Sequence, residues 1–85
     1  MSYRVEIKVS AQKELMALPS SAKDRVISHI DALAENPRPS GCKKLTGAEK
    51  AYRIRIGDYR VVYEIENRVL VVLIVRIAHR REVYR

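Results

Sequence analysis

The chain has 85 residues, a formal net charge of +7, and hydrophobic residues at 47% of its positions. This length supports one small core, so residues 1–85 are expected to form a single domain. The longest apolar run, Val69–Val75, is too short to span a bilayer, and the start of the chain lacks the apolar segment of a signal peptide. We therefore expect a soluble cytoplasmic protein, and its single cysteine, Cys42, agrees with a reducing compartment.

The excess positive charge is confined to the second part of the chain. Residues 1–36 contain five lysines and arginines and five acidic residues, whereas residues 37–85 contain twelve and five. Such an asymmetry indicates a polyanionic partner, of which nucleic acid is the commonest, and an acidic protein is the alternative.

The chain begins with a pattern typical of one strand and a short helix. Apolar and polar residues alternate from Tyr3 to Val9, which is the period of a strand with one buried face. Ser10 fits the N-cap of a helix over Ala11–Leu18. Pro19 is expected to end this helix, because proline has no amide hydrogen to continue the ladder.

A second helix is expected to begin at Ser20 or Ser21 and to stop before Asn36-Pro37, because the residue before a proline is disfavoured in helical geometry. Ser21 and Asp24 have the spacing of a capping box. The two helices are expected to form an antiparallel pair that covers one face of a sheet.

The stretch Ala51–Ile65 predicts a basic β-hairpin. Its first arm alternates polar and apolar residues, and Gly57-Asp58 fits a two-residue loop with glycine at the first central position of a type II′ turn. Facing residues of a hairpin share a side of the sheet, so this loop places one set of side chains toward the core. The predicted core set is Tyr52, Ile54, Ile56, Tyr59, Val61 and Tyr63.

The other side of the hairpin carries Arg53, Arg55 and Arg60. Like charges that lie directly opposite each other destabilise a sheet, so three arginines on one side indicate an anion site. The alternative is that each guanidinium is solvated, or paired with Glu64 or Glu66.

The remaining segments supply more basic residues and one buried strand. Pro37–Lys50 is expected to be a loop, in which Lys43 and Lys44 extend the basic surface as candidate RNA-binding residues. After a turn at Glu66–Arg68, the apolar run of Val69–Ile77 predicts a central strand buried on both faces. A basic tail with an aromatic residue near its end follows.

Together these stretches resemble the RelE/ParE superfamily of bacterial and archaeal toxin–antitoxin systems, in particular its RelE branch. The resemblance covers nearly the whole chain, and the hairpin and tail are its specific parts. The matching stretches are 11–15 (AQKEL), 36–37 (NP), 43–47 (KKLTG), 52–63 (YRIRIGDYRVVY) and 79–84 (HRREVY). The implied fold is α+β, in the order β-α-α-β-β-β, with an antiparallel sheet packed on an N-terminal helix pair and a short C-terminal tail or turn of helix.

The RelE resemblance implies a ribosome-dependent endoribonuclease that cleaves mRNA in the A site, with the RNA's own 2′-hydroxyl as nucleophile and without a metal or other cofactor. It implies three partners, namely a cognate RelB-like antitoxin, the ribosome and mRNA, and no membrane. Carried over one by one, the catalytic positions fall on Arg53, Arg55, Arg60, Arg80 and Tyr84. The tail spacing varies, so Arg81, otherwise an RNA-binding candidate, could take the place of Arg80, and His79 is a further catalytic candidate.

The chemistry of such a reaction divides these residues into two groups. Attack by a 2′-hydroxyl needs a proton acceptor, stabilisation of the charge on the phosphorane, and a proton donor. Guanidinium groups suit the second task, and their pKa is too high for the other two. Tyr84, with a pKa lowered by arginines, or His79 would transfer protons, and Tyr84 could instead stack on a base. This weak acid–base set favours an enzyme whose RNA is aligned by the ribosome.

Two other functions stay open from the sequence. A ParE-like toxin that inhibits DNA gyrase without cleaving RNA would share the fold and the basic surface, although the arginines with Tyr84 favour the RelE branch. A non-catalytic nucleic-acid-binding or antitoxin-binding module would lose affinity as salt rises and leave mRNA uncut.

Overall fold

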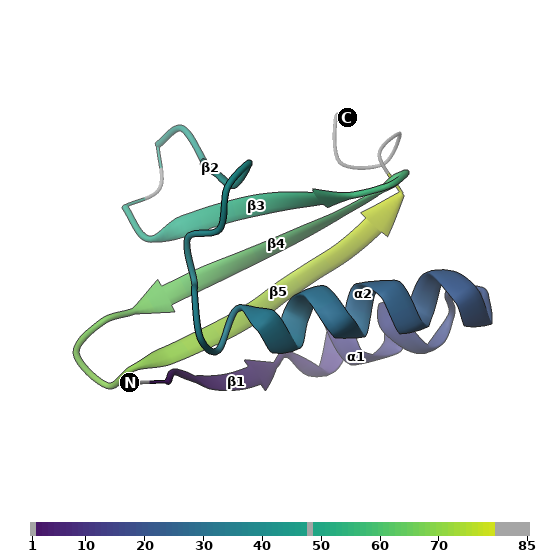
Figure 1. The fold of residues 1–85 in the computed structure, drawn as a ribbon, viewed down its shortest axis with the longest axis horizontal. Coiled ribbons are helices and arrows are strands. Elements are labelled where there is room, and N and C mark those ends of the chain that lie inside the picture. The colour runs from purple at the N-terminus through teal and green to yellow at the C-terminus, as the bar shows by residue number, and fades with distance from the viewer. Residues whose placement is uncertain (1, 48, 80–85) are drawn as a thin grey trace.

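The computed structural model describes residues 2–47 and 49–79, which form the seven elements of Figure 1. In chain order they are β1 (Arg4–Ile7), α1 (Val9–Met16), α2 (Ser20–Ala32), β2 (Lys43–Lys44), β3 (Ala51–Ile56), β4 (Tyr59–Glu66) and β5 (Val71–His79). The α+β class and the predicted order are confirmed, with the short strand β2 added inside the expected loop. The C-terminal tail, with Arg80, Arg81 and Tyr84, lies outside the described residues.

The strands form one sheet in the order β1-β5-β4-β3-β2. From β2 to β5, neighbouring strands run antiparallel as predicted, because tight turns connect β3 to β4 and β4 to β5. β1 instead pairs with β5 in parallel, so the sheet is mixed and not wholly antiparallel. The two helices and the other three strands lie between β1 and β5 in the chain. A connection of this length permits parallel pairing, which a tight turn does not.

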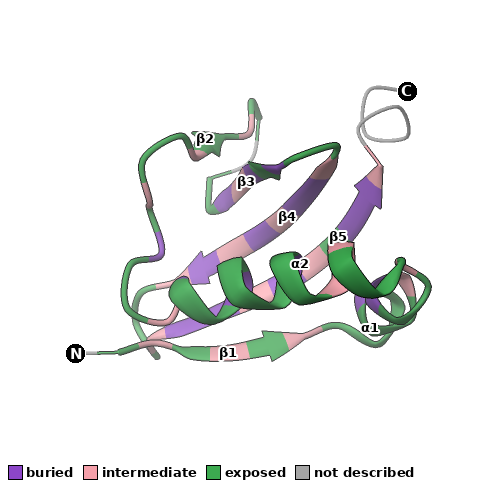
Figure 2. Cartoon of the chain, turned by 45° about the vertical axis from the view of Figure 1, so that its right-hand side comes forward, coloured by how far each residue is buried: buried purple, intermediate pink, exposed green. Residues whose placement is uncertain are grey.

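The two helices cover one face of the sheet, and the core lies between the layers (Figure 1). α1 packs on β5 and α2 packs on β3, and the outer surface of α2 is largely exposed (Figure 2). Large, fully buried side chains come from both layers, namely Tyr63, Leu33, Ile65, Ile74, Val26, Val61 and Val72. Within residues 2–47 and 49–79, neither helix is both long and apolar enough to cross a membrane.

Both helices begin without the predicted serine caps. α1 begins at Val9, so Ser10 lies inside the helix, and Val9 is 67% exposed instead of continuing the buried side of the first strand. α2 begins at Ser20, directly after Pro19, and neither helix has a side-chain hydrogen bond at its N-cap. Proline suits this boundary because its φ is close to helical and the first helical amides need no intrahelical acceptor. Ser21 therefore falls too late to form a capping box.

Strand β5 begins later than predicted. Glu66 pairs with Val71, so the four residues 67–70 form the turn between β4 and β5. Leu70 has a φ of +53°, and Val69 is 65% exposed. Val69 and Leu70, the first two residues of the apolar run, therefore lie in the turn, because the pairing of Glu66 with Val71 leaves residues 67–70 to connect the strands. The rest of the run forms a strand between β1 and β4, as its apolar character predicts.

Candidate functional site

The hairpin of β3 and β4 has the predicted register. Arg55 lies opposite Arg60, as a two-residue loop over 57–58 requires. Gly57 has a φ of +60°, and a Cβ at this position would lie 3.1 Å from Nη2 of Arg25. Glycine at this turn therefore permits both the left-handed backbone and the close approach of a side chain from α2.

A depression of about 270 Å³ lies on the side of the hairpin turned away from the core, and we call it the arginine depression. Its lining residues are Gly41, Lys43, Arg53, Arg55 and Arg60. Lys43 pairs with Arg53 across β2 and β3, and facing side chains share a side of the sheet. Arg55 and Arg60 share that side by the same rule. The structure thus brings the three predicted arginines together and adds Lys43.

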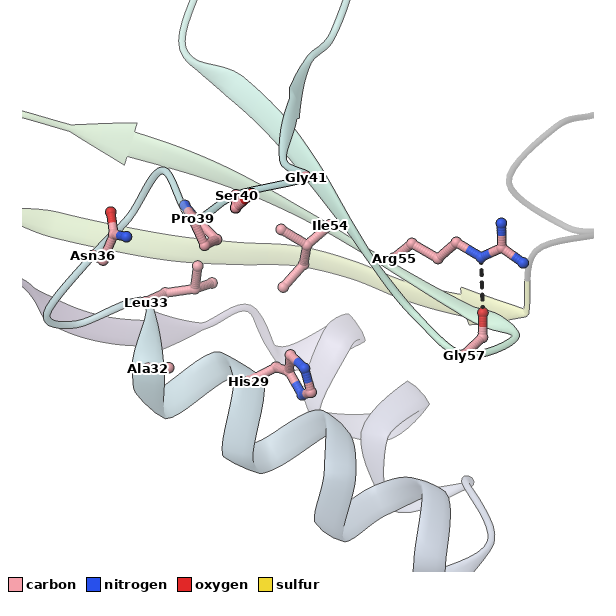
Figure 3. Close-up of a pocket in the computed structure, with 10 residues that line it drawn as sticks. All are labelled: His29, Ala32, Leu33, Asn36, Pro39, Ser40, Gly41, Ile54, Arg55 and Gly57. Atoms are coloured by element: carbon pink, nitrogen blue, oxygen red, sulfur yellow. Dashed lines mark hydrogen bonds between the residues drawn. The ribbon is translucent and has the colours of Figure 1, made fainter.

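Two arginines of the arginine depression differ in exposure. Arg60 is only 6% exposed, whereas Arg55 is exposed. A buried cation is screened less by water than an exposed one, so Arg60 can act more strongly than Arg55 on an anion nearby. Arg55 Nε donates a hydrogen bond to the carbonyl oxygen of Gly57 at 3.1 Å, which orients its guanidinium (Figure 3).

The lining of the arginine depression suits anion binding and not proton transfer. Its functional groups are one ammonium and three guanidinium groups. The planar fork of guanidinium N–H groups matches phosphate oxygens, and a guanidinium group is charged in proteins. The arginine depression can therefore hold a phosphate and stabilise added negative charge, whereas a proton acceptor and a proton donor must come from outside its lining.

Tyrosines of the sheet fix the loop that carries Gly41. Tyr63 Oη donates a hydrogen bond to the carbonyl oxygen of Pro37 at 2.8 Å, and burial raises the pKa of Tyr63. Tyr52 stacks on Tyr63 with ring centroids 6.0 Å apart. Arg38 Nε donates to Tyr52 Oη at 3.2 Å, and this hydrogen bond raises the pKa of Arg38. The loop is thereby held against β3 and β4 at the wall of the arginine depression.

Two other predicted site residues lie elsewhere. Lys44 pairs with Tyr52, so it belongs to the core side of the sheet and not to the arginine side. His79 ends β5 opposite Tyr59, and their rings meet edge to face with centroids 5.6 Å apart. Both rings line a separate hollow of about 300 Å³ together with Glu14 of α1. Across the described ranges, no three His, Cys, Asp or Glu side chains gather as ligands for a metal ion.

Sequence reasoning missed Glu14, which completes the end of the sheet. One oxygen of its carboxylate accepts a hydrogen bond from the backbone amide of Ile77 at 2.8 Å. The other oxygen lies 3.9 Å from Nε of Arg76. The ladder between β1 and β5 stops at Ile74, so Glu14 serves an amide that β1 does not reach. The only sequence signal for Glu14 is its position in the stretch 11–15 (AQKEL), and this position does not predict the contact with Ile77.

The second missed feature is a groove of about 610 Å³ between α2 and β3, which we call the α2–β3 groove (Figure 3). Leu33, directly after α2, Pro39 of the following loop and Ile54 of β3 contribute apolar walls. The α2–β3 groove shares Gly41 and Arg55 with the arginine depression. No sequence pattern marks it, because its walls come from segments that meet only in the folded chain.

Comparison with known proteins identifies the family. Residues 5–84 match the ParE toxin family of type II toxin–antitoxin systems, parDE. A Methanocaldococcus jannaschii protein provisionally named toxin RelE1 is 33% identical over 88 residues, which cover 100% of this chain and 98% of that protein.

Solved structures of similar fold carry RelE names. RelE in the RelE–RelB complex of Pyrococcus horikoshii OT3 has a TM-score of 0.84 and 34% identity, covering 94% of this chain and 97% of that chain. Escherichia coli RelE, solved in the free state with two arginines replaced by alanine, has a TM-score of 0.83 and 27% identity, covering 99% and 92%. This chain therefore belongs to the RelE/ParE superfamily of toxins from type II toxin–antitoxin systems, and its relatives place it among the RelE-like members.

Proposed function

We propose that this chain is an endoribonuclease toxin that cleaves mRNA in the ribosomal A site and is neutralised by a RelB-like antitoxin. The observation that carries the proposal is the gathering of Arg53, Arg55 and Arg60 around one depression, with Lys43 beside them. A surface used only for solubility gains nothing from like charges on facing residues. A phosphate in the arginine depression would offset their repulsion.

The proposed reaction is attack of the RNA 2′-hydroxyl on the adjacent phosphorus. The bond from phosphorus to the 5′-oxygen of the next nucleotide breaks, which leaves a 2′,3′-cyclic phosphate and a 5′-hydroxyl. Negative charge accumulates on the non-bridging oxygens during the attack, and fixed guanidinium groups stabilise it. Because Arg60 is buried, its field is less screened by water than that of an exposed arginine.

Proton transfer in this proposal falls to residues outside the lining of the arginine depression. Tyr84, Arg80 and Arg81 belong to the tail, and His79 lies immediately before it at the end of β5. A site with strong charge stabilisation and few dedicated acid–base groups gains most from a substrate held in a reactive geometry. The ribosome is proposed to supply that alignment, with Lys43 contacting the RNA backbone and Lys44 contributing to long-range attraction.

The antitoxin proposal follows from the complexes of similar proteins. The Pyrococcus horikoshii protein was solved with RelB, the Mycobacterium tuberculosis protein as the RelBE2 complex, and an Escherichia coli RelE variant with an antitoxin RelBc peptide. We expect the antitoxin of this chain to be acidic where it crosses the arginine depression, because complementary charge speeds association and excludes wrong partners.

The decisive experiment is a translating extract with primer extension to map cuts in mRNA. We expect the wild-type chain to cut within codons and to leave 5′-hydroxyl ends, which are ligated only after treatment with a kinase. Arg55→Ala should lower the cleavage rate by about 100-fold or more, because one stabilising donor is lost. The matched control is Arg68→Ala, since Arg68 is exposed and lies in the turn after β4.

Other results would overturn the proposal in distinct ways. Uncut mRNA together with inhibited DNA gyrase would assign the chain to ParE-like toxins. Uncut mRNA with salt-sensitive RNA binding would indicate a non-catalytic module. If the wild-type chain and Arg55→Ala cleave mRNA at the same rate, the arginine depression does not act in the cleavage as proposed.

A further inference from the structure

The turn of the β3–β4 hairpin brings together two arginines from different layers of the fold. Arg55 of β3 donates a hydrogen bond from Nε to the carbonyl oxygen of Gly57 at 3.1 Å (Figure 3). Arg25 of α2 approaches the same glycine from the helix layer. Its Nη2 and Nη1 lie 3.1 Å and 3.4 Å from the position that a Cβ of residue 57 would take. The two guanidinium groups therefore lie against one residue of the turn.

Neither guanidinium group is neutralised by a carboxylate in the part of the chain that the structure describes. Arg25 and Arg55 form no ion pair there, and this includes Asp58, the second residue of the turn. One helical turn from Arg25 on either side lie Ser21 and His29, which carry no negative charge. Two cations close to the same residue repel each other, so this arrangement favours an anion beside them.

The glycine of the turn also fixes where the Arg25 head group lies. Gly57 has a φ of +60°, and a side chain at this position would need the space that the Arg25 guanidinium occupies. An exposed arginine that is free to rotate loses conformational entropy when it binds a ligand. Contact with the turn limits the rotamers of Arg25 before binding, so part of this loss does not count against affinity.

The pair at the turn continues the basic surface of the arginine depression. Arg55 belongs to the lining of the depression, whereas Arg25 does not. The basic surface therefore extends from the depression past the hairpin turn to α2. A nucleic-acid strand carries a negative charge at every nucleotide, so a strand with one phosphate in the arginine depression presents further phosphates nearby. A row of guanidinium groups suits such a repeated charge better than a single anion.

We infer that Arg25 and Arg55 form a second phosphate site at the hairpin turn, which takes a backbone phosphate of the mRNA beside the scissile one. The identity of this ligand rests on the proposed function. Arg25 then binds the substrate away from the reacting atoms and helps to align the strand with the arginine depression. Contact with a phosphate that does not react stabilises the bound substrate and the transition state alike, so it should affect binding more than the saturated rate.

Single-turnover cleavage on ribosomes programmed with a short mRNA tests this split. Arg25→Ala should raise the half-saturating concentration of the chain by about fivefold and leave the saturated rate within about twofold of wild type. Arg25→Lys keeps the charge and should raise that concentration by less than about twofold. The matched control is Lys13→Ala, which removes one cation from an exposed position of α1 that lines none of the described hollows.

An mRNA with one uncharged methylphosphonate in place of a phosphate beside the scissile one identifies the contact. At one such linkage, the replacement should raise the half-saturating concentration of the wild-type chain by about fivefold and leave that of Arg25→Ala almost unchanged. The two losses are not additive, because the same contact can be removed only once. If Arg25 merely supported the turn, the two losses would instead multiply at every linkage.

A binding measurement without cleavage separates this inference from the proposed function. The probe is a single-stranded RNA oligonucleotide with 2′-O-methyl groups, which cannot be cut by 2′-hydroxyl attack. Its affinity is measured at several salt concentrations. Arg25→Ala should reduce the slope of log affinity against log salt by about 0.7, the loss of one phosphate contact, and Lys13→Ala should leave the slope unchanged.

The inference is wrong if Arg25→Ala and Lys13→Ala give the same salt slope, whether or not the wild-type chain cuts mRNA. Uncut mRNA together with a reduced slope for Arg25→Ala would overturn the proposed function and support the phosphate site. If Arg25→Ala changes neither RNA measurement and weakens only the binding of the antitoxin, Arg25 belongs to the antitoxin contact, and the inference is again overturned.

Discussion

The arginine depression and the α2–β3 groove border the same strand, and most of their lining residues differ in chemistry. Successive residues of β3 point to opposite sides, so Arg53 and Arg55 line the first hollow while Ile54 faces the second. One hollow is lined by cations, and the other has an apolar floor with a basic rim. A single strand thus serves two surfaces, and Arg55 is the side chain common to both.

Side chains on the two sides of the strand are buried for different reasons. Leu33 and Ile54 are buried because removal of apolar surface from water stabilises the fold. Arg60 is buried although its desolvation opposes folding. We therefore expect substitutions on the arginine side to change activity more than stability, and substitutions on the groove side to do the reverse.

The largest expected effect is on catalysis. Arg60→Met should lower the rate of mRNA cleavage by about 100-fold to 1,000-fold, because it removes a cation aimed at the developing charge. The effect on the free energy of unfolding should be smaller, about 1.5 kcal/mol or less, since methionine fills similar space. Cleavage in a translating extract and urea denaturation measure the two quantities. A protein that loses stability but still cleaves would erase the contrast between the two sides.

The converse substitution is Leu33→Ala in the groove floor. It should lower the free energy of unfolding by about 2–5 kcal/mol, because it deletes buried methyl groups and leaves a cavity. Cleavage per folded molecule should stay within about twofold of wild type, since this change supplies or removes no charge. Urea denaturation measures the free energy of unfolding. The control Leu33→Met keeps the side-chain volume and should lower this free energy by less than about 1.5 kcal/mol.

Glu14 tests a region outside both hollows. Glu14→Ala should lower the free energy of unfolding by about 1–3 kcal/mol, because the amide of Ile77 loses its acceptor. Glu14→Gln keeps an acceptor oxygen and should lose less than half as much. Thermal unfolding of both variants gives the comparison. Equal losses would show that the charge of Glu14, and not its hydrogen bond, stabilises the end of β5.

The smallest expected effect concerns Tyr63, which holds the loop shared by the two hollows. Tyr63→Phe should cost about 0.5–1.5 kcal/mol at neutral pH through loss of the bond to Pro37. Burial raises the pKa of Tyr63 above its usual value near 10, so the unfolded chain loses this proton first. The contribution of Tyr63 to stability should thus be constant below about pH 10 and fall above it. Urea denaturation across pH should show a shallower fall for Tyr63→Phe; parallel curves would contradict this assignment.

Much of the candidate site could be predicted because the hairpin is defined by local chemistry. Alternation along β3 and the glycine at the turn set which residues face each other, and Arg55 lies opposite Arg60 as predicted. The boundaries of the helices were less predictable, because Pro19 replaced the serine cap and Val9 opened α1. Strand β2 was missed, since a two-residue pairing leaves no periodic signal.

By itself, the sequence determined the α+β class, the hairpin register and the side of the sheet on which three arginines gather. These depend on turn residues and on a period of two, which act between near neighbours in the chain. Only the tertiary structure decided that β1 lies parallel to β5, that Arg60 is buried, and that Gly41 and Arg55 border two hollows. Those features arise where distant segments pack together, and such packing energies leave no repeating pattern in the sequence of either segment.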